Sequence, residues 1–330
     1  MTLRPPSLLR LALAALVTLG LWAAPAAAQG TWPARPITLI VPFPAGGTTD
    51  VLARIFAERM SADLGQRVVV DNRGTAGGTT AAAFVARSAP DGYTLFISNV
   101  STHALAPNLY RNLPYDTLTA FEPVALMTTS AGVLIAHPSV KAADAKELAA
   151  LLKANPGKFN YASPGNGTGG HLGMERFRSM AGLDVVHVPF NGSGPARNAV
   201  LAGEPPIMFE NIQTTISLHQ AGKLKVLAVA DEKRSPKLPG VPTMAEQGFP
   251  GLNVSSWTAF FLPAGTPRPI VERLHKSALD ALNHPDTQRR LADLSTEAVG
   301  STPAELAAFV KKEYDDWGAI IRAQGLKIDN

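Results

Sequence analysis

Cysteine is missing from all 330 residues of the chain. This absence excludes a disulfide framework, a thiol nucleophile, a cysteine-ligated cluster and a lipid attached through cysteine. The folded state must therefore depend on apolar packing. Hydrophobic residues make up 46% of the sequence, and a chain of this length has enough of them to bury the cores of about two domains.

A concentrated positive surface is also missing. The chain has 30 Lys and Arg residues against 26 Asp and Glu residues, which gives a formal net charge of +4. The basic residues are dispersed, since Glu313 and Asp315 closely follow Lys311 and Lys312. No basic stripe carries the interleaved aromatic side chains that track nucleic acid, so nucleic acid is not an expected partner.

Catalytic and metal-binding patterns are absent from the sequence. The seven histidines show no H-E-x-x-H spacing, and there is no G-x-S-x-G nucleophile elbow. The sequence therefore predicts no metal site, no catalytic residue and no cofactor. One alternative stays open, an α/β hydrolase in which Ser163 and His171 meet in space.

Apolar runs of spanning length are confined to the N-terminus. Residues 11–28 are almost entirely leucine and alanine, follow a start that contains Arg4 and Arg10, and end in an A-x-A pattern. This three-part layout is typical of a secretory signal, and we expect cleavage after Ala28. The mature chain is then expected to be exported and soluble.

Strands and helices alternate behind this segment. Apolar runs at residues 37–41, 67–70 and 93–98 predict three strands. Glycine-rich turns follow the first two strands, and helices are predicted from Thr48 and over residues 79–86. Repetition of strand, glycine turn and helix favours a parallel sheet with helices on both faces.

The middle and the end of the chain continue this alternation. A further helix is predicted over residues 144–154, and further strands over residues 159–162, 185–190 and 224–230. At the C-terminus, Thr266 and Thr302 are predicted to cap helices opened by the prolines that follow them. The second of these helices carries an apolar stripe at residues 306, 310, 314, 317 and 321.

The C-terminal helices need a sheet to cover, and the first three strands offer one. We therefore expect the chain to leave a first lobe near Thr129 and to return to it near Val254. The expected division is a signal peptide of residues 1–28, a first lobe of residues 29–130 plus 252–330, and a second lobe of residues 131–251.

The loop P-F-P-A-G-G-T-T-D at residues 42–50 is the most informative of the chain. A strand, a glycine pair and a helix start place free backbone N–H groups around one point, which suits an anion. No P-loop lysine follows, so a carboxylate is favoured over a phosphate. Asp50 has two interpretations, direct ligand contact or stabilisation of its own loop and helix.

Two more glycine-rich turns follow strands. Residues 74–79 form a second predicted N–H cradle beside the first. Residues 165–170 match G-x-G-x-x-G, but Asp184 precedes the next strand, where a dinucleotide site needs an acid after it. We interpret this loop as a third cradle. His103 after the third strand and His171 at a helix start are predicted to bind the ligand or the loops.

The residues quoted above resemble one known family. P-F-P-A-G-G-T-T-D, N-Y-A-S-P-G-N-G-T-G-G-H at residues 160–171 and V-P-F-N-G-S-G at residues 188–194 are similar to motifs of the substrate-binding proteins of tripartite tricarboxylate transporters, the Bug receptors. R-S-P at residues 234–236, V-P-T at 241–243 and P-A-G-T-P at 263–267 are similar as well. The resemblance runs from about Trp32 to the C-terminus.

The resemblance implies an α/β periplasmic-binding-protein fold, with two doubly wound lobes, a ligand cleft and crossing hinge strands. It implies a periplasmic receptor, not an enzyme, that holds a small carboxylate through backbone N–H groups and ordered waters. Its partners would be the permease subunits of such a transporter, and a monomer is the expected state. A sensing subunit for a signalling protein is the remaining alternative. The ligand remains open among dicarboxylates, tricarboxylates, aromatic acids and acidic amino acids.

Together the loops and the resemblance predict a set of ligand-binding residues. They are Phe43, Ala45, Gly46, Gly47, Thr48, Asp50, Gly77, Gly78, Thr79, Thr102, His103, Ser163, Asn166, Gly167, Thr168, Gly169, His171, Phe190, Ser193 and Glu210. The family often has an Asp-Asn pair where this chain has Glu210 and Asn211. The longer acid either reaches further into the cleft or changes a surface loop without consequence.

Overall fold

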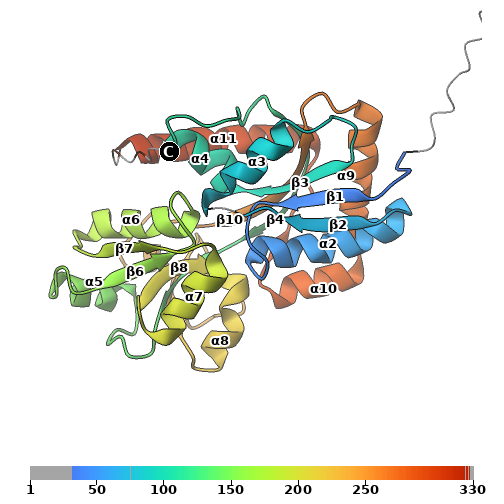
Figure 1. Cartoon of the computed structure of the whole chain (residues 1–330). Coiled ribbons are helices and arrows are strands. Elements are labelled where there is room, and N and C mark those ends of the chain that lie inside the picture. The colour runs from blue at the N-terminus through green and yellow to red at the C-terminus, as the bar shows by residue number, and fades with distance from the viewer. Residues whose placement is uncertain (1–31, 75, 324, 326, 328–330) are drawn as a thin grey trace, which may run out of the picture. The chain divides into compact units, whose positions relative to one another are not determined.

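The first sheet is mixed and has six strands in the order β11-β4-β10-β3-β1-β2 (Figure 1). In the computed structural model these strands are β1 (Ile37–Val41), β2 (Val68–Asn72), β3 (Thr94–Asn99), β4 (Phe121–Ser130), β10 (Ser256–Pro263) and β11 (Glu297–Ala298). β1 pairs in parallel with β2 and β3, as the sequence predicts. β10 runs antiparallel to β3 and β4, so the sheet as a whole is not the purely parallel one expected.

The second sheet has five strands in the order β7-β6-β8-β5-β9. They are β5 (Gly132–Ala136), β6 (Asn160–Ser163), β7 (Val186–Pro189), β8 (Ile207–Asn211) and β9 (Lys225–Ala230). β6 is parallel to β7 and β8, whereas β5 is antiparallel to both of its neighbours.

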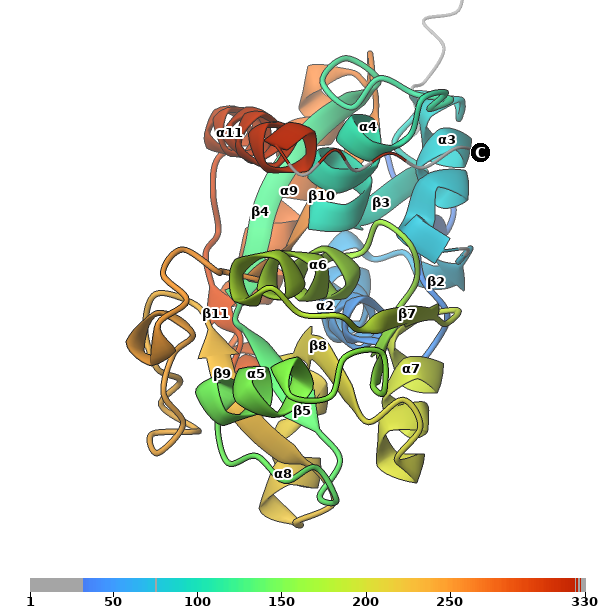
Figure 2. The same ribbon diagram turned by 90° about the vertical axis from the view of Figure 1, so that its left-hand side faces the viewer.

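The helices cover these two sheets. The first lobe is the first sheet with α2 (Thr48–Leu64), α3 (Thr79–Ala86), α4 (Ala106–Leu109), α9 (Arg268–Asn283), α10 (Pro285–Asp293) and α11 (Pro303–Ala323). The second lobe is the second sheet with α5 (Ala145–Lys153), α6 (Gly169–Ala181), α7 (Ser193–Ala202) and α8 (Ile216–Gln220). Figure 2 shows the same ribbon turned by 90° about the vertical axis, with α6 of the second lobe facing the first lobe.

The structure describes residues 32–74, 76–323, 325 and 327. Residues from Arg35 onward form one compact unit. The predicted signal peptide and its cleavage site lie outside the described residues. Among the helices that are described, none has the length and apolarity needed to cross a membrane.

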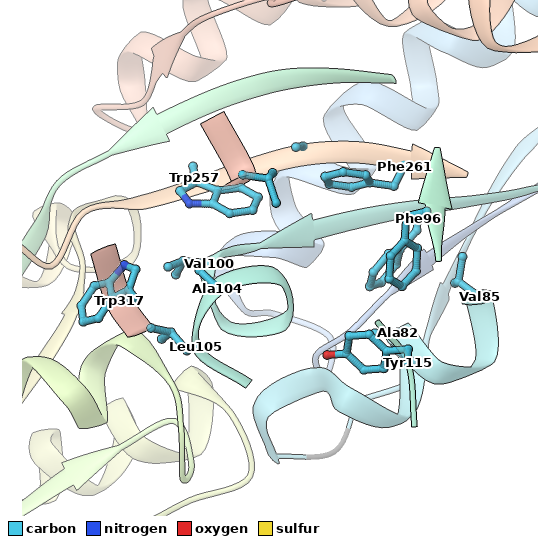
Figure 3. Close-up of a cluster of buried hydrophobic side chains, with 14 of the residues drawn as sticks. Ala82, Val85, Phe96, Val100, Ala104, Leu105, Tyr115, Trp257, Phe261 and Trp317 are labelled. Atoms are coloured by element: carbon cyan, nitrogen blue, oxygen red, sulfur yellow. The ribbon is translucent and has the colours of Figure 1, made fainter. Parts of the chain in front are cut away.

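An aromatic-rich core lies between the first sheet and the helices on one of its faces (Figure 3). Trp257 and Phe261 of β10 belong to this core together with Trp317 of α11, and all three side chains are buried. Four of the five residues of the predicted apolar stripe of α11 pack in this core, whereas Tyr314 is half-buried and outside it. Thr302 and Glu305 exchange the two hydrogen bonds of a capping box, which confirms the predicted helix start.

The cap predicted at Thr266 is wrong. The N-cap of α9 is Pro267, and the hydroxyl of Thr266 donates a hydrogen bond back to the carbonyl oxygen of Pro263. The hydroxyl closes the preceding turn instead of accepting from the helix, because threonine satisfies either kind of local bond.

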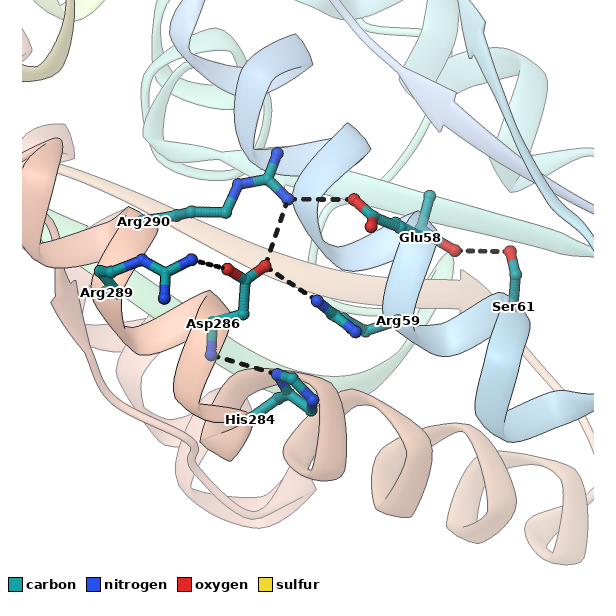
Figure 4. A network of polar contacts seen from close by, with 8 residues as sticks. Glu58, Arg59, Ser61, His284, Asp286, Arg289 and Arg290 are labelled. Atoms are coloured by element: carbon teal, nitrogen blue, oxygen red, sulfur yellow. Dashed lines mark hydrogen bonds and ion pairs between the residues drawn. The ribbon is translucent and has the colours of Figure 1, made fainter.

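α2 is tied to α10 by charged side chains (Figure 4). Arg59 lies 2.8 Å from Asp286, and Arg290 lies 3.0 Å from Glu58. The ring of His284 also accepts a hydrogen bond from the backbone N–H of Asp286. Exposed pairs of this kind add little stability singly, but as a network they fix the helix whose N-terminus forms part of the site described below.

The chain passes between the sheets twice. It goes from β4 to β5 at Ala131, and from β9 back to β10 through residues 231–255. The two crossings touch, because a Cβ placed on Gly132 would lie 2.3 Å from the carbonyl oxygen of Val254. Only glycine fits at this contact.

Candidate functional site

A cavity lies where loops of the two lobes meet. It encloses about 730 Å³ of empty space, part of which is open to solvent. Its lining comes from loops at the ends of β1, β3, β6 and β8, from the start of α7, and from the crossing before β10. The lining residues are Phe43, Pro44, Ala45, Gly47, Thr48, Thr49, Asn99, Val100, Ser101, Pro164, Thr168, Gly169, Gly170, Gly192, Ser193, Gly194, Pro195, Phe209, Glu210, Asn211, Val254, Ser255 and Ser256.

The N-terminus of α2 forms one wall of this cavity. Its N-cap is Gly47, and no side chain caps the helix. The first backbone N–H groups of the helix, with the positive end of its dipole, therefore stay available to a ligand. Gly46 adopts a left-handed backbone conformation with φ +83°, which explains the first glycine of the pair in this loop.

Asp50 faces its own loop. Its carboxylate accepts a hydrogen bond from the backbone N–H of Gly46 at 2.9 Å and pairs with Arg54. Burial alone would raise the pKa of Asp50, but the hydrogen bonds from Arg54 and Gly46 bring it below its ordinary value. Of the two interpretations, this geometry favours stabilisation of the loop, and Asp50 does not line the cavity.

The turn that holds Gly77, Gly78 and Thr79 lies behind the first loop and does not line the cavity. Gly78 has φ +74°, and a Cβ there would come within 2.8 Å of the Pro42 side chain. A Cβ on Gly77 would approach the Asn166 carbonyl oxygen, in the second lobe, at 3.5 Å. This turn therefore supports the α2 loop and the contact between the lobes.

His103 is inside the core of the first lobe. Its ring is fully buried, stacks on Phe261 at 4.2 Å between centroids and hydrogen-bonds the hydroxyl of Ser98. Burial lowers the pKa of His103 to about 3, so the ring is neutral. The neighbouring Thr102 is also fully buried, and neither residue reaches the cavity.

The N-terminus of α6 forms the second wall. Its N-cap is Thr168, whose hydroxyl accepts from the backbone N–H of His171, so this helix is partly capped by its own chain. Thr168 and Gly169 line the cavity, whereas Asn166 and Gly167 do not. The N–H of Gly167 donates to the ring of His171, which therefore holds the loop.

Ser163 pairs with a different histidine from the one considered in the sequence. Its hydroxyl lies 2.6 Å from His187 and accepts from the backbone N–H of Gly165. The ring of His187 stacks on that of His171 at 4.1 Å. Burial, with His171 as a smaller contribution, lowers the pKa of His187 to about 3. Ser163 is fully buried and outside the cavity lining. The Ser163–His187 pair therefore supports the loop at residues 163–170 from behind.

The N-terminus of α7 forms the third wall. Its N-cap is Gly192 with φ +98°, and no side chain caps this helix either. A Cβ on Gly192 would lie 3.2 Å from the side chain of Pro44 in the first lobe. Ser193 lines the cavity, while Phe190 packs against the core of the second lobe.

Glu210 reaches the cavity from the end of β8 and is 4% exposed. Burial raises the pKa of Glu210 to about 7, against the lowering effects of the Asn211 N–H, Arg197 and Ser193. Beside it, the side chain of Asn211 donates to the hydroxyl of Thr48 across the two lobes at 3.3 Å. The two lobes are therefore in contact around the cavity, in a closed arrangement.

Of the predicted site residues, eight lie together on the cavity wall. They are Phe43, Ala45, Gly47, Thr48, Thr168, Gly169, Ser193 and Glu210. The others support the loops from behind or lie in the cores.

Other lining residues were not predicted as site residues, among them Asn99 and Ser101 at the end of β3 and residues 254–256 in the crossing segment. The rule that ligands bind beyond the carboxyl ends of strands points to Asn99, whereas the crossing segment carries no motif.

The chemistry of the cavity is that of an anion site. Three helix N-termini face one space, two of them without side-chain caps, and no Lys, Arg or His lines it. Among the described residues, no group of three or more potential metal ligands occurs. Two lobes closed around such a site define a binding protein of the periplasmic type.

Comparison with known proteins identifies the family. Residues 52–326 match the family described as the tripartite tricarboxylate transporter family receptor, and the chain belongs to it. This confirms the resemblance seen in the sequence. The protein is accordingly a periplasmic receptor of a transport system and not an enzyme, as expected.

Solved structures of similar proteins have the same fold. The periplasmic binding protein BugD is 36% identical, with a TM-score of 0.87 over 91% of this chain and 100% of that chain. An R. palustris protein with adipate is 33% identical, with a TM-score of 0.87 over 91% of this chain and 100% of its own. MatC from Rhodopseudomonas palustris with bound malate is 35% identical, with a TM-score of 0.85 over 88% and 100%. The two-lobed periplasmic-binding-protein fold is thus confirmed.

Proposed function

We propose that this protein captures a small dicarboxylate between its lobes and delivers it to the permease subunits of a tripartite tricarboxylate-type transporter. One observation carries the proposal: α2 of the first lobe and α7 of the second both turn uncapped N-termini toward one cavity. Each terminus suits one carboxylate, so a ligand with two carboxylates links the lobes. The adipate and malate of the two R. palustris proteins agree with this ligand class.

The proposed ligand-binding set is the eight predicted residues on the cavity wall, with Asn99, Ser101 and Asn211 added. The proposed lobe boundaries are those of the sequence analysis, residues 29–130 plus 252–330 and residues 131–251. We also propose a signal peptide cleaved after Ala28 and a monomeric mature protein, to be checked by mass spectrometry of the exported protein and by sedimentation.

Thermal unfolding of residues 29–330 against mono-, di- and tricarboxylates tests the ligand class. A ligand that binds only the folded state adds about 2.7 kcal/mol at a hundredfold excess over its Kd. We expect dicarboxylates to give the largest rise in Tm. Equal Tm with and without every carboxylate would contradict the proposal. Deletion of the gene is expected to abolish high-affinity uptake of the bound carboxylate by cells.

Proline substitution tests the helix N-termini directly. Thr48 is the first residue of α2 and follows an extended Gly47, so Thr48→Pro keeps the helix while it removes one N–H. A hydrogen bond to a charged ligand contributes about 1.5–3 kcal/mol, so we expect a Kd at least about tenfold higher. Thr48→Val keeps the N–H and is the matched control. Equal affinities of the two variants would exclude this N–H from the site.

A further inference from the structure

Glu210 is the only ionisable residue in the cavity lining defined by the described residues. Every other polar group there is a hydroxyl, an amide or the backbone. A lone acid in a site built for anions needs an explanation, because an ionised carboxylate repels the ligand proposed above.

One oxygen of Glu210 is unused. Oε1 accepts a hydrogen bond from the backbone N–H of Asn211 at 2.7 Å, whereas Oε2 is buried without a hydrogen-bond partner. The nearest cation, Arg197 Nη1, lies 3.8 Å from Oε2, which is beyond hydrogen-bond distance. Buried carboxylate oxygens normally have partners, so Oε2 has a hydrogen-bonding capacity that the described residues leave unused.

The groups that face Glu210 leave its charge poorly compensated. Arg197 of α7 is the charged neighbour that acts on it, and the backbone N–H of Asn211 and the side chain of Ser193 are neutral groups that lower its pKa. On the neighbouring strand β5 the paired residue is Val133. With a pKa of about 7 the acid holds its proton in part at neutral pH, and a ligand carboxylate nearby raises that pKa further.

We propose that Glu210 binds the ligand as a carboxylic acid, donating a hydrogen bond from Oε2 to a ligand carboxylate, so that ligand capture takes up a proton. This inference rests on the proposed function. The proton comes from the solvent and resides on Oε2, and no covalent bond of the ligand changes. The hydrogen bond replaces a repulsion between two carboxylates by a strong charge-assisted contact.

The opposite use of the same acid predicts the opposite pH dependence. An ionised Glu210 that paired with an ammonium group of an amino acid would bind more tightly as pH rises through 7. A protonated Glu210 that donates to a carboxylate binds more tightly as pH falls. The direction in which Kd changes with pH therefore distinguishes the two possibilities.

Titration calorimetry of succinate, malate and adipate binding between pH 6 and 8.5 tests the proposal. Measurements in phosphate and in Tris give the number of protons exchanged, because the two buffers differ in ionisation enthalpy. We expect proton uptake that approaches one per ligand at pH 8.5, and a Kd that rises toward tenfold per pH unit above the pKa. This readout needs no variant.

Glu210→Gln provides the second readout. Its amide N–H offers a donor that does not titrate, so we expect a pH-independent Kd and, at pH 8.5, affinity about tenfold higher than that of the original protein. Glu210→Ala has no donor and is expected to bind weakly at every pH. Glu204→Gln, an exposed change six residues earlier, is the matched control and should keep the original slope.

Each contrary result has its own meaning. Binding without proton uptake, or weaker binding by Glu210→Gln at pH 8.5, overturns the proposal and leaves the receptor function intact. Tighter binding of aspartate than of succinate, increasing with pH, assigns Glu210 to an ammonium group instead. If no carboxylate binds, the proposed function fails and this inference fails with it.

Discussion

At the scale of single residues, the site uses few charged groups, and each has a cost or a structural task. Asp50 holds its loop and Glu210 lies buried on the cavity wall. Sequence patterns located both acids in the right loops. They could not separate the two roles, because the direction of a side chain depends on neighbours such as Arg54 and Arg197 that are fixed only by folding.

Glu210 should make stability depend on pH. Its folded pKa of about 7 lies above the ordinary 4.5, so its contribution is fully present below pH 4.5 and is lost as pH rises toward 7. Relative to Glu210→Gln, we expect the free energy of unfolding of the unliganded protein to fall by on the order of 1–3 kcal/mol across this window. Urea unfolding at pH 4.5, 6 and 8 measures this free energy. The same dependence on pH in the original protein and in Glu210→Gln would contradict the prediction.

Asp50→Asn should weaken the α2 loop. The carboxylate accepts from Gly46 and Arg54, and we expect a loss of about 1–2 kcal/mol in the free energy of unfolding at pH 7. Because the folded pKa of Asp50 is lowered, its contribution is present above the ordinary 3.8 and disappears as pH falls below it. Urea unfolding at pH 7 and pH 3 should show this difference narrowing. Glu58→Gln, in an exposed pair on the same helix, should change stability by less than about 0.5 kcal/mol.

At the scale of helices and strands, local patterns predicted most elements near the right residues. β1 and α3 have the predicted bounds, and α5 begins and ends one residue inside its prediction. Five strands were not predicted: β4, β5, β8, β10 and the two-residue β11. β4, β5, β8 and β10 lie in the interior of their sheets, and their hydrophobic runs lack the glycine turns that followed the first two predicted strands.

The contact of α6 with the second crossing should be sensitive to one methyl group. A Cβ on Gly173 would lie 2.6 Å from the side chain of Val254, so Gly173→Ala is expected to cost about 1–3 kcal/mol of stability. The double variant with Val254→Ala should lose less than the sum of the two changes. Gly194→Ala, at a helical position with no atom within 4 Å of the new Cβ, should be stabilising by up to about 1 kcal/mol. If denaturant unfolding shows that the losses of Gly173→Ala and Val254→Ala simply add in the double variant, the two residues do not clash directly.

At the scale of the whole molecule, the lobes are joined by apolar contact as well as by the chain. Leu172 of α6, in the second lobe, is 2% exposed and belongs to the core cluster that holds Val100 and Trp257 of the first lobe. Burial of this side chain stabilises the closed arrangement and must be undone when the lobes separate.

Leu172→Ala should therefore favour an open form. We expect an affinity for the bound carboxylate lower by about tenfold, and a larger radius of gyration in X-ray scattering without ligand. Leu148→Ala, buried inside the second lobe, should lower Tm without either effect. If Leu172→Ala lowers Tm but leaves the affinity and the radius of gyration unchanged, Leu172 contributes to core packing and not to the balance between open and closed forms.

The division of the anion cradle between α2 and α7 also sets the timing of transport. In the proposed binding mode each lobe offers one uncapped terminus, so a molecule held by both can leave only after one of them withdraws. The residence time of the ligand is then set by the rate at which the lobes separate. A membrane partner that separates the lobes would control ligand release without contacting the ligand itself.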